Sequence, residues 1–274
     1  MAVFVGCMSL QTTGAAPTLG TNGHSSNRGY EMKRRTFLSQ AAGAGLGLIP
    51  AAAGFALGAA DAPSARPITR GEPLKPPANG RIRAAFAIAE GATVIDFAGP
   101  WEVFQDVQVA APGSRHMMPF ELYTVAATAK PITATGGMKI IPNYAIDDAP
   151  RPHVVIVPAL RGNPALLEWL AAVAPETDVT MSVCTGAFQL ARAGLLDGLA
   201  ATTHHDFYDS FAQEFPRVKL ERGLRFVENP RIATSGGLSS GIDLALRVVE
   251  RYFGRDVARQ TADYMEYTGT GWQV

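Results

Sequence analysis

The residue with the clearest capacity for chemistry is Cys184, which stands where an apolar run meets a glycine-containing segment. The run 179–183 has the length of a buried strand, and Thr185 and Gly186 follow as the start of a helix. Such a turn exposes the side chain at its apex and directs backbone N–H groups, here those of Thr185 and Gly186, toward the atom that the sulfur attacks. The helix N-terminus favours a thiolate with a lowered pKa. Alternatively, Cys184 is a small buried apolar residue.

A carboxyl group that can serve this thiol occurs upstream, at Asp96. It follows the apolar run 82–89 and has apolar neighbours, which desolvate a carboxyl group and raise its pKa. In a doubly wound sheet the carboxyl ends of neighbouring strands meet at one crevice, so Asp96 and Cys184 can lie together there. A protonated carboxyl group can donate a hydrogen bond to a thiolate and later move a proton. The alternative is that Asp96 caps a helix expected after Pro100, or closes a turn.

The elements that must position these residues are short strands alternating with helices. Four apolar runs have the length of buried strands, and several of them lack polar alternation, which is typical of a parallel sheet covered on both faces. They are 82–89, 120–126, 154–158 and 179–183, and the expected helices are 101–107, 164–173, 185–193 and 239–253. The alternation predicts a βαβ architecture in a single α/β domain from residue 81 to residue 274.

Composition narrows the classes of function. The chain has 274 residues and a formal net charge of +0, and no stripe of lysine and arginine stands out, so we expect no nucleic-acid partner. Its two cysteines are Cys7 and Cys184, and no Cys/His cluster has the spacing of zinc ligands. The sequence therefore predicts no metal and no cofactor, and a small molecule as the partner.

The segment 32–65 has the order of an export signal. Arg34 and Arg35 precede Phe37 and Leu38, and an uncharged run rich in alanine and glycine follows, which resembles a twin-arginine signal. A retained membrane anchor is the alternative, but glycine and alanine insert weakly and Pro50 interrupts the run. We therefore expect a periplasmic or otherwise exported protein that meets the membrane only through this signal. Segment 66–80, rich in proline, is expected to be a structureless tether.

Residues 1–31 precede this signal and show no periodic pattern. An export signal belongs at the extreme N-terminus, and Met32 stands directly before its basic residues. We therefore expect 1–31 to be a non-native or disordered extension, with translation starting at Met32. A peptide from 12–28 in the unprocessed precursor would contradict this.

Several motifs in order resemble the ThiJ/PfpI superfamily of glutamine-amidotransferase-like domains, and more narrowly the isocyanide hydratases and the ligand domains of AraC-type regulators. These motifs are 95–104, 183–187, 193–198, 201–204, 234–237 and 241–246. The resemblance implies a flavodoxin-like, doubly wound sheet and a homodimer. It also implies that Cys184 is the nucleophile, that Asp96 is its acid and that Thr185 lines the pocket. His204 matches a Thr-Thr-His position, where it either acts at the site or hydrogen-bonds the backbone behind it.

The sequence departs from the family pattern at two places. The peptidase branch places histidine directly after the nucleophile, where this chain has Thr185, so a proteolytic Cys/His pair is unsupported. The hydratases tend to carry Pro-Gly-Gly after the third apolar strand, where this chain has Pro158, Ala159 and Leu160.

Three interpretations remain open from the sequence. The first is an exported enzyme that uses Cys184 and Asp96 on a small electrophilic carbon, most closely an isocyanide hydratase-like hydration to an N-substituted formamide. The second is a periplasmic ligand-binding or redox-sensing module without turnover. In the third, the fold is retained for stability or interaction and Cys184 is idle.

Overall fold

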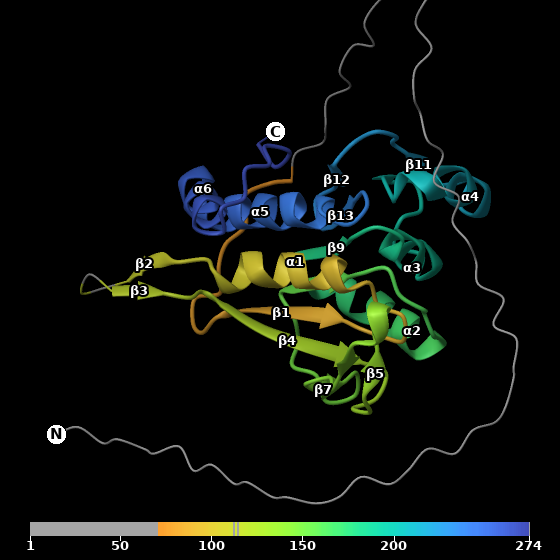
Figure 1. The fold of residues 1–274 in the computed structure, drawn as a ribbon, viewed down its shortest axis with the longest axis horizontal. Helices are drawn as coiled ribbons and strands as arrows, with labels where there is room; N and C mark the ends of the chain where they lie inside the picture. The colour runs from red at the N-terminus through yellow and green to blue at the C-terminus, as the bar shows by residue number, and fades with distance from the viewer. Residues whose placement is uncertain (1–70, 112, 114, 274) are drawn as a thin grey trace, which may run out of the picture. The chain divides into compact units, whose positions relative to one another are not determined.

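The structure is a computed structural model that describes residues 71–111, 113 and 115–273. These residues form one compact unit around a seven-stranded sheet (Figure 1). The strand order is β12-β13-β9-β8-β1-β4-β7, and every neighbouring pair is parallel except β12 and β13. The predicted single α/β domain with a mostly parallel sheet is thereby confirmed. The predicted extension 1–31 and export signal 32–65 lie outside the described residues.

The elements have these bounds. The central strands are β1 (Ile82–Ala87), β4 (Phe120–Ala126), β7 (Tyr144–Ala145), β8 (Val154–Val157), β9 (Val179–Ser182), β12 (Phe226–Glu228) and β13 (Ile232–Ser235). Small two-stranded sheets pair β2 (Val109–Ala111) with β3 (Arg115–Met117), β5 (Ile132–Thr133) with β6 (Lys139–Ile140), and β10 (Ala200–Ala201) with β11 (Lys219–Leu220). The α-helices are α1 (Val94–Gln105), α2 (Pro164–Val173), α3 (Gly186–Arg192), α4 (Tyr208–Glu214), α5 (Ser240–Phe253) and α6 (Arg255–Tyr264), and short 3₁₀ helices are η1 (Thr135–Gly137), η2 (Ala174–Glu176) and η3 (His205–Phe207).

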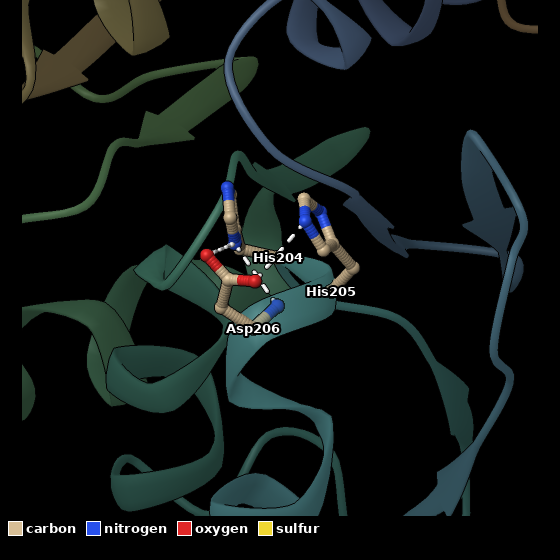
Figure 2. A group of neighbouring side chains, drawn as sticks. All are labelled: His204, His205 and Asp206. Carbon is tan, nitrogen blue, oxygen red and sulfur yellow. Dashed lines mark hydrogen bonds and ion pairs between the residues drawn. The ribbon is translucent and has the colours of Figure 1, made fainter. Parts of the chain in front are cut away.

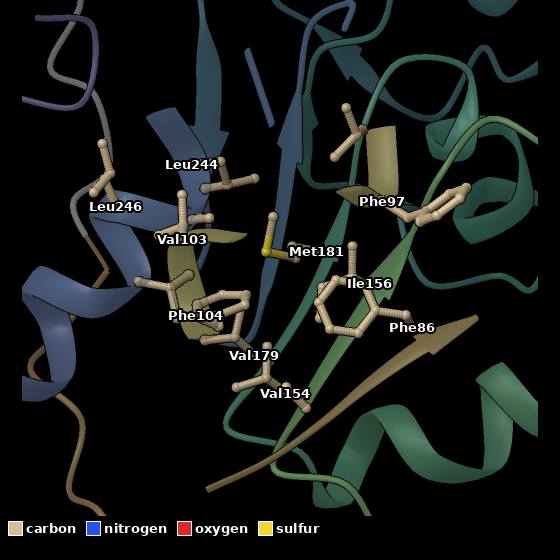
Figure 3. Packing of buried hydrophobic residues seen from close by; sticks show 14 of the residues in the cluster. Phe86, Phe97, Val103, Phe104, Val154, Ile156, Val179, Met181, Leu244 and Leu246 are labelled. Atoms are coloured by element: carbon tan, nitrogen blue, oxygen red, sulfur yellow. The ribbon is translucent and has the colours of Figure 1, made fainter. Parts of the chain in front are cut away.

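Strand β1 shows why the central strands are apolar throughout. Ile82, Ala84 and Phe86 belong to one buried cluster, whereas Ala85 and Ala87 belong to a second. Because successive side chains of a strand point to opposite faces, both faces of the sheet are covered, as the sequence predicted. Figure 3 shows the first cluster, in which strand and helix side chains interlock.

Different helices cover the two faces. The cluster in Figure 3 takes Val103 and Phe104 from α1 and Leu244 and Leu246 from α5. The second cluster takes Leu166 and Leu170 from α2, and Ala187 and Leu190 from α3. The hairpin β2–β3 extends away from this body (Figure 1).

The first helix differs from the prediction, and this difference affects the site. We expected a helix at 101–107 with Asp96 in the preceding loop, but α1 begins at Val94 and contains both Asp96 and Pro100. Pro100 has no N–H to donate to the carbonyl of Asp96 four residues earlier, which argues against a helix on local grounds. Tertiary packing outweighs this loss, since Phe97, Val103 and Phe104 of α1 are buried against the sheet and α5.

Two further features were not predicted. Strands β12 and β13 were not recognised, because Glu228, Thr234 and Ser235 interrupt their apolar residues and no apolar run stands out. Residues 71–80 of the expected tether contain no helix or strand, but the N–H of Leu74 donates to the carbonyl of Arg251 at 2.7 Å. Within the described ranges, no helix has the length and apolar character needed to cross a membrane.

Candidate functional site

The site is assembled from segments that follow four adjacent strands of the parallel sheet. Asp96 comes after β1, Ala159 after β8, Cys184 after β9 and Leu238 after β13, and these strands are neighbours in the order β13-β9-β8-β1. Parallel strands end at the same edge of a sheet, so four segments far apart in sequence meet there. The predicted convergence of Asp96 and Cys184 therefore rests on the strand order.

Cys184 occupies a strained turn between β9 and α3. Its φ is 58°, in the left-handed region that residues other than glycine rarely adopt, and its N–H donates to the carbonyl of Gly236 at 2.9 Å. A Cβ at Gly186 would lie 2.0 Å from the carbonyl oxygen of Val157, so only glycine fits at that position. The backbone thus holds the cysteine in a costly conformation, as expected for a nucleophile elbow.

The carboxyl group of Asp96 is fully buried and only partly satisfied. Its Oδ2 accepts a hydrogen bond from the N–H of Ala159 at 3.1 Å, whereas Oδ1 has no well-formed hydrogen bond to any of the described residues. Burial raises the pKa of Asp96 to about 6, opposed by the Ala159 amide, the Cys184 thiol and the Leu238 amide. The alternative that Asp96 caps the helix is wrong, because Thr93 is the N-cap residue of α1.

The thiol differs from the expectation. The helix N-terminus was predicted to lower its pKa, but burial and the nearby Asp96 carboxylate raise the pKa of Cys184 to about 11. The backbone and side chain of Thr185 and the backbone of Leu238 oppose this rise. The correction has a physical reason: α3 has only seven residues, and the 7% exposed cysteine gains little from it compared with the cost of burying a thiolate.

Only one of the two predicted backbone donors interacts with the thiol. The Thr185 amide interacts with the thiol, as expected. The Gly186 amide donates instead to the carbonyl of Val183 at 2.9 Å and is therefore used within the turn. The interaction expected of Gly186 is supplied by the Leu238 amide, which comes from the other side of the site.

His204 lies behind the site. A Cβ at Gly237 would lie 2.1 Å from its Cδ2, so the imidazole ring packs against the loop that carries Leu238. Its Nδ1 accepts from the N–H of Asp206 at 3.2 Å. The neighbouring Thr203 makes the hydrogen bond that we considered for His204, since its Oγ1 donates to the carbonyl of Cys184 at 2.9 Å.

The amides of Leu238 and Ala159 were missed by sequence reasoning, because a backbone donor leaves no trace in residue type. The signal that was available is Gly236-Gly237, since paired glycines permit close approach of a loop. Leu238 has a φ of 53° and a side chain that is 45% exposed, while Ile95 beside Asp96 is 40% exposed. Phe97, on the other side of Asp96, is buried in the core.

The arrangement places one proton between two acceptors. Above about pH 6 the carboxyl group is ionised while the thiol keeps its proton, so the resting pair is a thiol beside a carboxylate. Such a carboxylate can accept the thiol proton as the sulfur attacks and return it afterwards.

Comparison with known proteins identifies relatives of this chain. The profile of the DJ-1/PfpI family matches residues 82–251. The isonitrile hydratase of Pseudomonas putida is 28% identical over 195 residues, which cover 68% of this chain and 78% of the hydratase. The HTH-type transcriptional regulator CdhR of Pseudomonas aeruginosa is 30% identical over 149 residues, which cover 53% of this chain but only 44% of the regulator. The chain therefore spans less than half of that relative.

A solved structure is also similar. The crystal structure of a ThiJ/PfpI family protein from Pseudomonas syringae superposes with a TM-score of 0.61 at 26% identity, covering 76% of this chain and 84% of that one.

Proposed function

Because the chain belongs to the DJ-1/PfpI family, we propose that it is an enzyme in which Cys184 attacks a small electrophilic carbon while Asp96 moves the proton. The observation that carries the proposal is the fully buried Asp96 carboxyl group, which interacts with the thiol and keeps one oxygen without a well-formed hydrogen bond to any described residue. A buried carboxyl group with a pKa near neutrality is costly for folding and suits an acid–base residue.

The favoured reaction is the hydration of an isonitrile, R–N≡C, to the formamide R–NH–CHO. The sulfur bonds to the terminal carbon as the Asp96 carboxylate takes the thiol proton and delivers it to the same carbon, which gives the thioimidate R–N=CH–S–Cys184. Water then adds across the C=N bond with Asp96 again transferring the proton. The resulting R–NH–CH(OH)–S–Cys184 collapses to the formamide and regenerates the thiol, so no redox partner is needed.

Three observations support this choice of substrate class. The alignment with the isonitrile hydratase of Pseudomonas putida covers 68% of the chain, which is long enough to span both Asp96 and Cys184. An isonitrile needs no charged binding group, and the residues beside the site, Ile95 and Leu238, present exposed apolar side chains. The amides of Thr185 and Leu238 can stabilise negative charge that develops near the sulfur.

The test is turnover of the purified domain with an alkyl or aryl isonitrile, with formamide production followed by chromatography. We expect the parent to produce formamide, with kcat/KM falling below about pH 6, where the Asp96 carboxylate becomes protonated. Cys184→Ser should reduce turnover at least about 10³-fold while the fold is retained, because a serine hydroxyl is a far weaker nucleophile. Turnover equal to that of the parent in Cys184→Ser would refute the proposal.

A ligand-binding module without turnover is the second candidate. It is favoured by the raised pKa of the thiol, which makes the resting sulfur less reactive than a free cysteine, and by the similarity to CdhR. Saturable binding of a small apolar ligand that is unchanged in Cys184→Ser, together with no turnover of isonitriles, glyoxals or small amides, would favour it over the enzyme.

We also propose that the protein is exported by the twin-arginine route and acts as a homodimer. Export rests on the sequence of 32–65 alone. The variant with both Arg34→Lys and Arg35→Lys should remain as precursor in the cytoplasm, while the parent reaches the periplasmic fraction. Delivery of the double variant at the parent's level would indicate the general secretory route. Sedimentation of the mature protein measures its assembly.

A further inference from the structure

His204, His205 and Asp206 follow one another at the start of η3, outside the thiol chemistry proposed above, and their side chains converge (Figure 2). One ligand atom from each lies within 4.8 Å of the others. Oδ1 of Asp206 is 3.1 Å from Nε2 of His205, and its Oδ2 is 3.7 Å from Nδ1 of His204. The carboxylate is therefore directed toward both rings.

The turn brings adjacent residues together in an unusual way. The two imidazole rings are stacked, with centroids 4.4 Å apart and planes inclined by 24°. Neighbouring residues within a regular helix do not face each other, but His204 is in extended conformation at the N-cap of η3 while His205 is already helical. Both rings thus lie on the same side of the chain.

One of the three ligands is fixed and two are adjustable. The side chain of His204 is 17% exposed, because it packs against Gly237 and lies 5.8 Å, ring centre to ring centre, from Phe207. Those of His205 and Asp206 are 73% and 68% exposed, so they can move by the small distances that coordination requires. If Nδ1 of His204 becomes a ligand, the Asp206 amide that it now accepts from turns to water.

We propose that these three residues form a site for a divalent transition-metal ion such as Zn²⁺, Co²⁺ or Ni²⁺, with water completing the coordination. Two imidazole nitrogens and one carboxylate oxygen are the donor set that such ions favour, whereas Mg²⁺ and Ca²⁺ prefer oxygen donors throughout. The thiol of Cys184 is not a member of the group. The site is therefore distinct from the thiol site, although His204 touches the loop that carries Leu238.

The experiment is calorimetric titration of tag-free protein with Zn²⁺, supported by the absorption spectrum with Co²⁺. We expect one ion per chain. Loss of an outer-shell partner commonly weakens a metal site about 10- to 100-fold, so removing a ligand by His205→Ala or Asp206→Asn should weaken binding at least about tenfold. Both residues are exposed, so circular dichroism of these variants should match the parent.

Two control variants separate this site from other sources of binding. His116→Ala removes an exposed histidine on β3 and should leave the affinity unchanged. Cys184→Ser should also leave it unchanged, and the Co²⁺ spectrum should lack a thiolate charge-transfer band. Binding that survives His205→Ala and Asp206→Asn, or that is lost in Cys184→Ser, would overturn the proposal.

Discussion

Two buried carboxyl groups of this protein have opposite surroundings. Glu228, at the end of β12, is fully buried and lies 2.9 Å from the guanidinium of Arg247 and 3.6 Å from that of Arg251. Asp96 is equally buried, but its nearest groups are amides and a thiol rather than a cation. Burial alone would lower the pKa of Arg247, yet the carboxylates of Glu228 and Glu250 raise it, so the Glu228–Arg247 pair stays charged. For Arg251 burial outweighs the attraction of Glu228 and lowers the pKa.

The difference indicates which buried charge serves folding and which serves chemistry. A paired charge is held in one state, because removing either partner strands the other in a medium that solvates it poorly. A buried carboxyl group without a cation is free to change its protonation state near neutral pH. The predictions below test this contrast, from the largest expected effect to the smallest.

Asp96→Asn should separate activity from stability most widely. The amide keeps the shape of the carboxyl group but neither accepts nor returns the thiol proton, so turnover should fall about 10²- to 10⁴-fold. At pH 7 the same variant should be more stable than the parent, because it no longer buries a charge. Turnover of isonitrile and chemical denaturation, measured side by side, check both halves. Unchanged turnover would make Asp96 a structural residue.

Glu228→Gln should have the opposite profile. It removes the fully buried carboxylate beside Arg247, which then keeps only Glu250 at 3.0 Å, and should destabilise the fold by about 3 kcal/mol, while turnover per folded molecule stays near that of the parent. Denaturant unfolding measures the loss. Adding Arg247→Met should recover part of it, since the uncharged methionine removes the buried guanidinium that Glu228→Gln deprives of its carboxylate. If Glu228→Gln were as stable as the parent, the proposed difference between Glu228 and Asp96 would be contradicted.

The pH dependence of stability should also carry the signature of Asp96. Its pKa is about 6 in the folded protein and 3.8 without burial, so between these values the folded state holds more protons than the unfolded state. The protonated Asp96 therefore favours the folded state: its contribution to the free energy of unfolding is complete below pH 3.8 and is lost as the pH rises through 6. Relative to Asp96→Asn, the parent should lose at most about 3 kcal/mol across this window. Parallel curves for the two proteins would contradict the raised pKa.

Thr203→Val should have the smallest effect. It removes the hydroxyl that donates to the carbonyl of Cys184 at 2.9 Å and leaves that buried carbonyl with one partner fewer. The expected cost is about 1 to 3 kcal/mol of stability. The pH dependence of thiol alkylation should shift only slightly, because the hydroxyl contacts the backbone of the elbow and not the sulfur. Thr203→Ser keeps the donor but loses one buried methyl group, so its alkylation profile should match the parent while its stability falls by about 0.8 kcal/mol.

The sequence predicted the sheet well because parallel strands buried on both faces leave long apolar runs, as in β1 and β8. Strands β12 and β13 lacked that signal, because polar residues such as Glu228 and Thr234 interrupt them. At the site, Cys184 and Asp96 carried their information in residue type and local pattern. The direction in which the pKa of the Cys184 thiol shifts could not be predicted in this way. It depends on the burial of Cys184 and its proximity to Asp96, which only the folded chain determines. The His204–Asp206 cluster was not predicted, because metal ligands in a sequence are expected several residues apart and these three are adjacent.

Position 238 is suited to protein engineering, because its side chain can be changed without losing its backbone amide. Its left-handed backbone would suit glycine, and leucine there costs about 1 to 2 kcal/mol, so the side chain occupies a position that local stability does not favour. The group that reaches the thiol is the amide, which every residue except proline retains. A library at this single position would therefore vary the exposed wall beside the elbow while the reacting groups stay in place, and its glycine member would be the most relaxed in backbone conformation.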